Sequence, residues 1–155
     1  MAELNRHQYR GTGLRNVGSY QISGHPYLSG TTAHANNKTK RFQFNSVSRE
    51  LTVFNLSSSN NELKVHFVSG SATGMDFSST DTVTVDANSS ALAGLHFVPL
   101  AAGESVTFIA KCKEIYVTNQ GGATVDYRIL ADLTGIDNSQ MYHVTGSGAS
   151  TVDGT

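Results

Sequence analysis

The sequence predicts an all-β protein, an antiparallel β-sandwich or jelly-roll-like barrel that follows an extended N-terminal arm. Three observations lead to this prediction. Ser, Thr, Asn and Gly fill 60 of the 155 positions, and these residues favour turns over helix interiors. From residue 39 onward, apolar and polar residues alternate with the period of two that is typical of half-buried strands. No segment shows the long 3.6-residue apolar period of an amphipathic helix.

The arm comprises residues 1–38, which differ from the rest of the chain. They contain five glycines and isolated large side chains, but no clean apolar period. The backbone entropy of such a segment opposes independent folding. Its apolar residues recur too regularly for a disordered tail. We therefore expect an extended arm that becomes ordered against another surface, either the body of its own chain or a neighbouring molecule.

The body, residues 39–144, contains seven alternating segments and is long enough to bury a core. The segment 125–133 is the clearest, because Val125, Tyr127 and Ile129 alternate with Asp126 and Arg128. Seven or eight short strands are typical of a sandwich or a jelly roll. The seven segments are 41–44, 51–56, 63–68, 95–98, 106–111, 115–118 and 125–133, and residues 81–86 are a candidate eighth strand. Turn-forming clusters at 57–61, 69–74, 86–90, 101–103 and 119–122 separate them.

The C-terminal end is predicted to contain little regular structure. Residues 136–142 fit one helical turn with Asp137 as its N-cap. Residues 145–155 are rich in Gly, Ser and Thr and predict a flexible tail.

The net charge of −1 conceals an uneven distribution. Residues 1–50 carry a net charge of +5, and residues 51–155 carry −6. A basic start and an acidic remainder attract each other, between copies or within one copy, unless both are simply solvated. The overall balance argues against bulk binding of nucleic acid.

The sequence also bounds the compartment. No apolar run approaches the roughly 20 residues that cross a bilayer, and the N-terminus MAELNRHQYRGTG lacks the apolar stretch of a secretory signal. The single cysteine cannot form an internal disulfide. We expect a soluble chain made in a reducing compartment.

No segment predicts a catalytic or cofactor site. His66 and His96 share the string HFV on predicted strands, where they are either two ligands of a metal or polar residues on the solvent face. Cys112 lies between Lys111 and Lys113, which suggests either a reactive thiol or a half-buried structural one. There is no G-x-S-x-G elbow and no phosphate-binding glycine loop. The expectation is a protein that is not an enzyme and carries no cofactor or metal.

Three strings carry a resemblance to a known family: GTGLRNVGSYQISGHPYLSG at 11–30, GLHFVPLAAGESVTFIAKCKEIYVTN at 94–119 and YRILADLTGIDNSQMYHVTGSG at 127–148. Together they resemble small virion structural proteins of tailed bacteriophages, above all marine and cyanobacterial ones, and in particular their head decoration or cement proteins. The resemblance implies a small β-sandwich on the outer surface of the capsid, with extended arms that join neighbouring copies and capsid subunits. It implies no catalytic residues.

The expected function is that of a capsid decoration protein, assembled in the bacterial cytoplasm and located on the virion. Its expected partners are the major capsid protein and copies of itself, as a dimer or trimer, without nucleic acid, membrane or small-molecule substrate. The alternatives are a neck, tail or fibre-associated β-protein and a carbohydrate-binding β-sandwich, although Trp, a common sugar platform, is absent. The residues expected to contact other chains are Arg6, Arg10, Arg15, Tyr20 and Tyr27.

Overall fold

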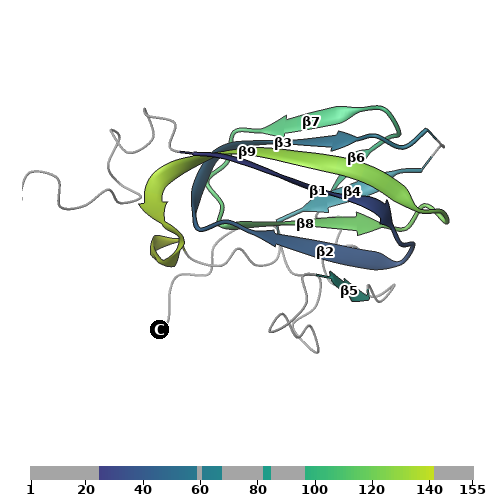
Figure 1. Cartoon of the computed structure of the whole chain (residues 1–155), viewed down its shortest axis with the longest axis horizontal. Helices are drawn as coiled ribbons and strands as arrows, with labels where there is room; N and C mark the ends of the chain where they lie inside the picture. Colours follow the sequence, from purple (N-terminus) through teal and green to yellow (C-terminus); the bar gives the residue numbers. More distant parts are fainter. Residues whose placement is uncertain (1–24, 59–60, 68–81, 85–96, 142–155) are drawn as a thin grey trace, which may run out of the picture.

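The computed structural model describes residues 25–58, 61–67, 82–84 and 97–141. These ranges contain nine strands and one short 3₁₀ helix (Figure 1). The elements are β1 (Pro26–His34), β2 (Lys38–Gln43), β3 (Ser46–Asn55), β4 (Leu63–His66), β5 (Thr82–Thr84), β6 (Val98–Leu100), β7 (Ser105–Phe108), β8 (Glu114–Asn119), β9 (Val125–Asp137) and η1 (Asn138–Gln140).

The strands form two antiparallel sheets. The four-stranded sheet has the order β1-β9-β3-β7, and the five-stranded sheet has the order β5-β2-β8-β4-β6. The pairing is nested, because β1 pairs with β9, β2 with β8, β3 with β7 and β4 with β6. The first four strands therefore meet the last four in reverse order, so segments far apart in the sequence lie side by side.

One apolar core joins the two sheets in a sandwich-like arrangement. Along β9, Val125, Tyr127 and Ile129 are fully buried, while Asp126 and Arg128 between them are exposed. Edge-to-face contact between Phe42 of β2 and Tyr127 of β9, at 6.0 Å between ring centroids, links one sheet to the other. The prediction of an all-β, two-layered fold is confirmed. The core cluster comprises Phe42, Phe44, Leu51, Val53, Leu63, Val65, Leu100, Cys112, Ile115, Val117, Val125, Tyr127, Ile129, Ala131 and Leu133.

The N-terminal part of the sandwich corrects the predicted arm. Residues 26–34 form β1, which pairs with β9 over most of its length, and Lys38 already begins β2. Residues 26–38 therefore belong to the sandwich. The alternation of β1 escapes notice because its inward positions after Tyr27 are Ser29 and Thr31, which are small and polar. The rest of the predicted arm, 1–24, and the predicted tail, 145–155, lie outside the described residues.

A second, smaller cluster closes one end of the molecule. Val47, Ile136 and Met141 pack together where β9 runs into η1 (Figure 1). The Asp137 side chain accepts a hydrogen bond from the Ser139 backbone N–H at 2.9 Å and caps η1. The predicted helical turn and its cap are confirmed, and the turn is a 3₁₀ helix of three residues.

Candidate interaction surface

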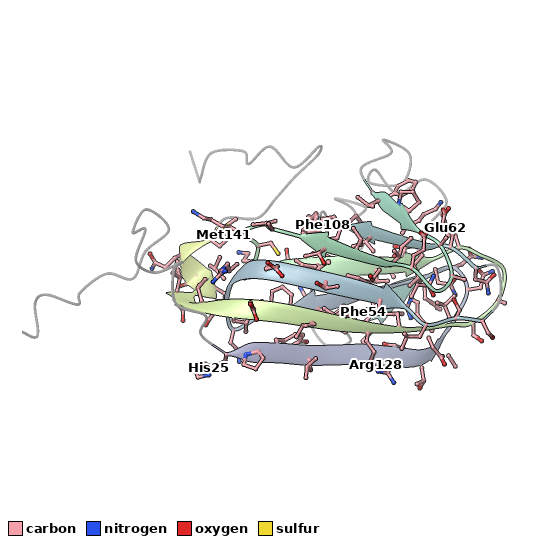
Figure 2. The ribbon with its side chains drawn as sticks, turned by 90° about the horizontal axis from the view of Figure 1, so that it is seen from above. His25, Phe54, Glu62, Phe108, Arg128 and Met141 are labelled. Carbon is pink, nitrogen blue, oxygen red and sulfur yellow. The ribbon has the colours of Figure 1, made fainter. Side chains whose placement is uncertain are left out.

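The outer face of the four-stranded sheet is the open face of the sandwich. Figure 2 looks onto it, with β1 along the lower edge and Phe54 and Arg128 labelled. One row of side chains across the strands consists of Leu28, Leu130, Thr52 and Thr107, and the next of Gly30, Arg128, Phe54 and Ser105. Leu28 is 75% exposed although it is apolar. This face therefore combines apolar side chains with a cation and hydroxyl groups, a mixture typical of contact surfaces.

The edge strand β1 is longer and less charged than edge strands usually are. Among the described residues, only β9 pairs with it. It is nine residues long and contains no Lys, Arg, Asp or Glu. The other edge strands are shorter: β7 has four residues, β5 three, and β6 three with Pro99 among them. Proteins blunt exposed edges by short length, charge, proline or a bulge. In β1 these features are limited to Pro26 at its start and a register irregularity between Thr31 and His34 near its end.

A shallow hollow of about 530 Å³ follows this edge. Its lining is Leu28, Ser29, Gly30, Thr31, Thr32 and Arg128. The Arg128 side chain lies over Gly30, since a Cβ on Gly30 would stand 2.8 Å from Arg128 Cδ. Arg128 Nη1 donates to the Tyr127 carbonyl at 2.9 Å, which holds the guanidinium against the sheet. The hollow is thus bounded by an apolar side chain, backbone and one cation.

The outer face of the five-stranded sheet differs, because its polar side chains are buried. Thr39, His66, Tyr116 and Thr118 are each no more than 2% exposed. The Thr118 hydroxyl bonds Thr39 Oγ1 at 2.7 Å and His66 Nε2 at 2.8 Å, and the His66 ring stacks on Tyr116. Thr39, Thr118 and His66 thus bond one another across β2, β8 and β4, so these buried groups are not offered for contact with another molecule.

The structure does not bring the predicted histidine pair together within its described part. His66 Nε2 is engaged with Thr118, and His96 lies outside the described residues. Throughout 25–58, 61–67, 82–84 and 97–141 there is no group of three or more His, Cys, Asp or Glu side chains that could hold a metal ion.

Cys112 is a structural thiol, and it is buried rather than half-buried. Its side chain is 3% exposed within the core cluster. Burial raises the pKa of the thiol to about 11, an effect that the hydrogen bond with Ser48 at 3.1 Å only partly opposes. The flanking lysines therefore do not activate it.

Of the five residues predicted to contact other chains, the structure describes one. Tyr27 is half-buried and packs edge-to-face against Phe44, with ring centroids 5.0 Å apart, so much of its ring serves the chain's own core. Arg6, Arg10, Arg15 and Tyr20 lie outside the described residues. Sequence reasoning missed Leu28, Gly30 and Arg128, because only the register of β1 on β9 places them along one open edge.

Within the described residues, no helix is long and apolar enough to cross a membrane. Comparison of the chain with protein-family models, with curated proteins and with solved structures finds no match.

Proposed function

We propose that this chain is a virion structural protein that acts without catalysis, a decoration or cement protein on the outer surface of a tailed-phage head. Its partners are the major capsid protein and further copies of itself, and assembly takes place in the bacterial cytoplasm. The observation that carries the proposal is the nested order of strand pairing. We infer from it that the sandwich is a jelly roll.

The strand order supports this inference step by step. A jelly roll is a long antiparallel hairpin rolled into two sheets. Without β5, the two sheets are β1-β9-β3-β7 and β2-β8-β4-β6. Each hairpin rung pairs a strand from the start of the chain with its counterpart from the end, and the pairs β3·β9 and β4·β8 close the roll. Viral capsid domains are a frequent use of this architecture.

The open face supports a role in repeated contacts. Leu28, Leu130 and Phe54 offer apolar area, and Arg128 offers a donor that suits carboxylates. Contacts through a few such side chains are weak one by one, and repetition over a lattice converts weak contacts into stable attachment.

Jelly rolls also occur as lectin domains, so the glycan-binding alternative shares the observation that carries the proposal. The two functions differ in what they predict for isolated protein. A lectin binds a sugar in the absence of any particle, whereas a cement protein requires the assembled shell.

Copy counting by quantitative mass spectrometry on purified particles tests the proposal. A shell protein is expected in hundreds of copies per particle, set by the symmetry of the shell. About a dozen copies would place the chain at the neck or tail instead, as expected for a ring around one axis. Absence from particles combined with binding on a glycan array would overturn the proposal in favour of the lectin.

A further inference from the structure

The direction of hydrogen bonding along β1 determines which of its backbone N–H and C=O groups are directed away from β9, along the open edge. Leu133 donates its backbone N–H to the His25 carbonyl at 3.1 Å. In an antiparallel ladder, alternate residues of a strand bond to the same neighbour. Tyr27, Ser29 and Thr31 therefore face β9 with their backbone groups. Leu28, Gly30 and Thr32 direct theirs away from β9, along the hollow that these residues line.

We propose that this edge is a docking site for an extended segment, residues 17–22 of a second copy of the chain, which adds a fifth strand beside β1. The inference deepens the proposed function, because it assigns a site to the contact between copies, but it requires no capsid. Addition of a strand to a sheet edge uses backbone hydrogen bonds for affinity and side-chain positions for specificity.

The sequence of the segment fits the edge. Residues 17–22, VGSYQI, are uncharged, as β1 is. Tyr20 and Ile22 are two apart and share one face of an extended strand. On the outer face they would cover Leu28, which is otherwise 75% exposed.

The chain's own segment fits the edge less well. In a tight hairpin with Ser23 and Gly24 as its two-residue turn, the backbone groups of His25 and Tyr27 would have to bond to the added strand, on the side away from β9. Those residues direct their backbone groups toward β9. With a turn one residue longer, the first β1 residue to pair with the chain's own segment would be Pro26. Proline has no backbone N–H and cannot donate to that ladder. A segment from another molecule is free of both restrictions.

Direct pairing of two β1 edges is the other arrangement of two copies. It would join only the few residues before the irregularity between Thr31 and His34. A single strand contact of this length is short of the roughly 1,200 Å² that specific, stable interfaces bury. Reciprocal exchange of residues 17–22 between two copies would form two such contacts.

Photocrosslinking between copies tests the proposal. One chain carries p-benzoylphenylalanine in place of Tyr20 and is labelled with ¹⁵N, and its unlabelled partner is the acceptor. We expect crosslinked peptides that join a ¹⁵N-labelled (heavy) chain to an unlabelled (light) chain. In the light chain, the crosslinked residue should lie within 26–34. In the acceptor, Leu28→Lys should remove most of this product. Leu56→Lys should leave it unchanged, because Leu56 is also exposed, at 53%, but lies beyond the end of β3.

The remaining outcomes overturn the proposal. Crosslinks only within heavy chains would assign the edge to the chain's own segment. Crosslinks to other surfaces, or equal loss with both lysine variants, would exclude the edge as the site. Circular dichroism confirms that each acceptor is folded. The experiment uses purified protein alone, so its failure leaves the copy number on particles, and with it the proposed function, to be decided separately.

Discussion

At Gly30 the edge strand β1 approaches β9 so closely that a side chain has no room. A Cβ there would overlap the Tyr127 carbonyl oxygen, which is backbone and cannot move aside. We expect Gly30→Ala to destabilise the fold by about 2 kcal/mol, because overpacking forces the two strands apart. Urea unfolding measures the change.

The matched control is Gly135→Ala, also in β9's sheet. Nothing lies within 4 Å of the position of its Cβ. Removal of a glycine from a strand should stabilise the fold slightly, by about 0.5 kcal/mol. Equal effects of the two substitutions would show that the close approach at Gly30 is not what selects glycine there.

His34 makes the stability of the fold depend on pH. It is 3% exposed, and Nε2 donates to the Lys38 carbonyl at 2.9 Å. Burial lowers the pKa of His34, the hydrogen bond to Lys38 raises it, and the charge of Lys40 lowers it further, with burial the largest effect. The neutral ring is thus the form that the fold accepts.

The sign of the pH dependence follows from that shift. Below the ordinary histidine value of 6.5 the unfolded chain binds a proton that the folded chain resists, so stability is complete above that pH and falls as the pH drops through it. We expect urea midpoints to decrease between pH 7.5 and pH 5. His34→Gln keeps a donor for Lys38 and should flatten the profile. An unchanged slope in this variant would assign the dependence to other groups.

At the scale of whole elements, strands with an apolar inner face were predictable and the edge strand was not. The segments 51–56, 115–118 and 125–133 lie within or largely within β3, β8 and β9, because each has large apolar residues at every second position. The predicted segment 95–98 stops at Val98 because Pro99 interrupts the alternation, whereas β6 continues through Pro99, which is tolerated on an edge strand. Residues 95 and 96 lie outside the described residues. After Tyr27, the inward side chains of β1 are small, and its outward Leu28 is exposed. The strand therefore lacks the alternation of large apolar and polar residues from which the other strands were predicted.

The sequence indicated a region of the chain for the candidate surface but not the residues that form it. The arm hypothesis placed contacts between chains in the N-terminal region and stays a prediction. The candidate surface lies along β1, which begins at Pro26. The residues that line it could not be named, because Arg128 is about a hundred positions away from Leu28 and Gly30 in the sequence. Which residues lie opposite each other depends on how the strands pair in the folded protein. A shift of one residue in that register would move every side chain of the strand to the other face of the sheet.

The turn between β8 and β9 depends on one buried amide. Asn119 Nδ2 donates to the His34 carbonyl at 2.8 Å and to the Ala123 carbonyl at 2.7 Å, and Oδ1 accepts from Gly121 N–H. Asn119→Asp keeps the shape but replaces the donor with an oxygen. We expect a loss of about 3 kcal/mol, because the buried His34 carbonyl and the part-buried Ala123 carbonyl both lose their donor. Thermal or urea unfolding measures it.

Asn36→Asp is the control for this turn. Asn36 is exposed and uses only its oxygen, which accepts from Gly122 N–H at 3.1 Å. A carboxylate oxygen accepts equally well, so this variant should unfold within about 0.5 kcal/mol of the parent. A comparable loss in both variants would mean that added negative charge, rather than the lost donor, weakens the turn.

At the scale of the molecule, nested pairing places early and late strands of the described chain side by side within each sheet. β9 pairs with β1 and β3, while β8 pairs with β2 and β4. The core between them takes side chains from every one of these strands except β1, whose Tyr27 packs at its margin. Neither sheet can keep its apolar face buried without the other, so we expect the sandwich to unfold in one step.

Cys112 reports this cooperativity without any added probe. It lies in the shared core, and burial raises the pKa of its thiol to about 11, so the folded protein should resist maleimide labelling at pH 8. In a urea series, labelling during a short pulse should rise with the same midpoint as the loss of far-UV circular dichroism. Ile109→Cys supplies the control, because Ile109 is 85% exposed and a thiol there should react in the folded state. Labelling of Cys112 at urea concentrations that leave the β-signal intact would show that the sheets separate before they unfold.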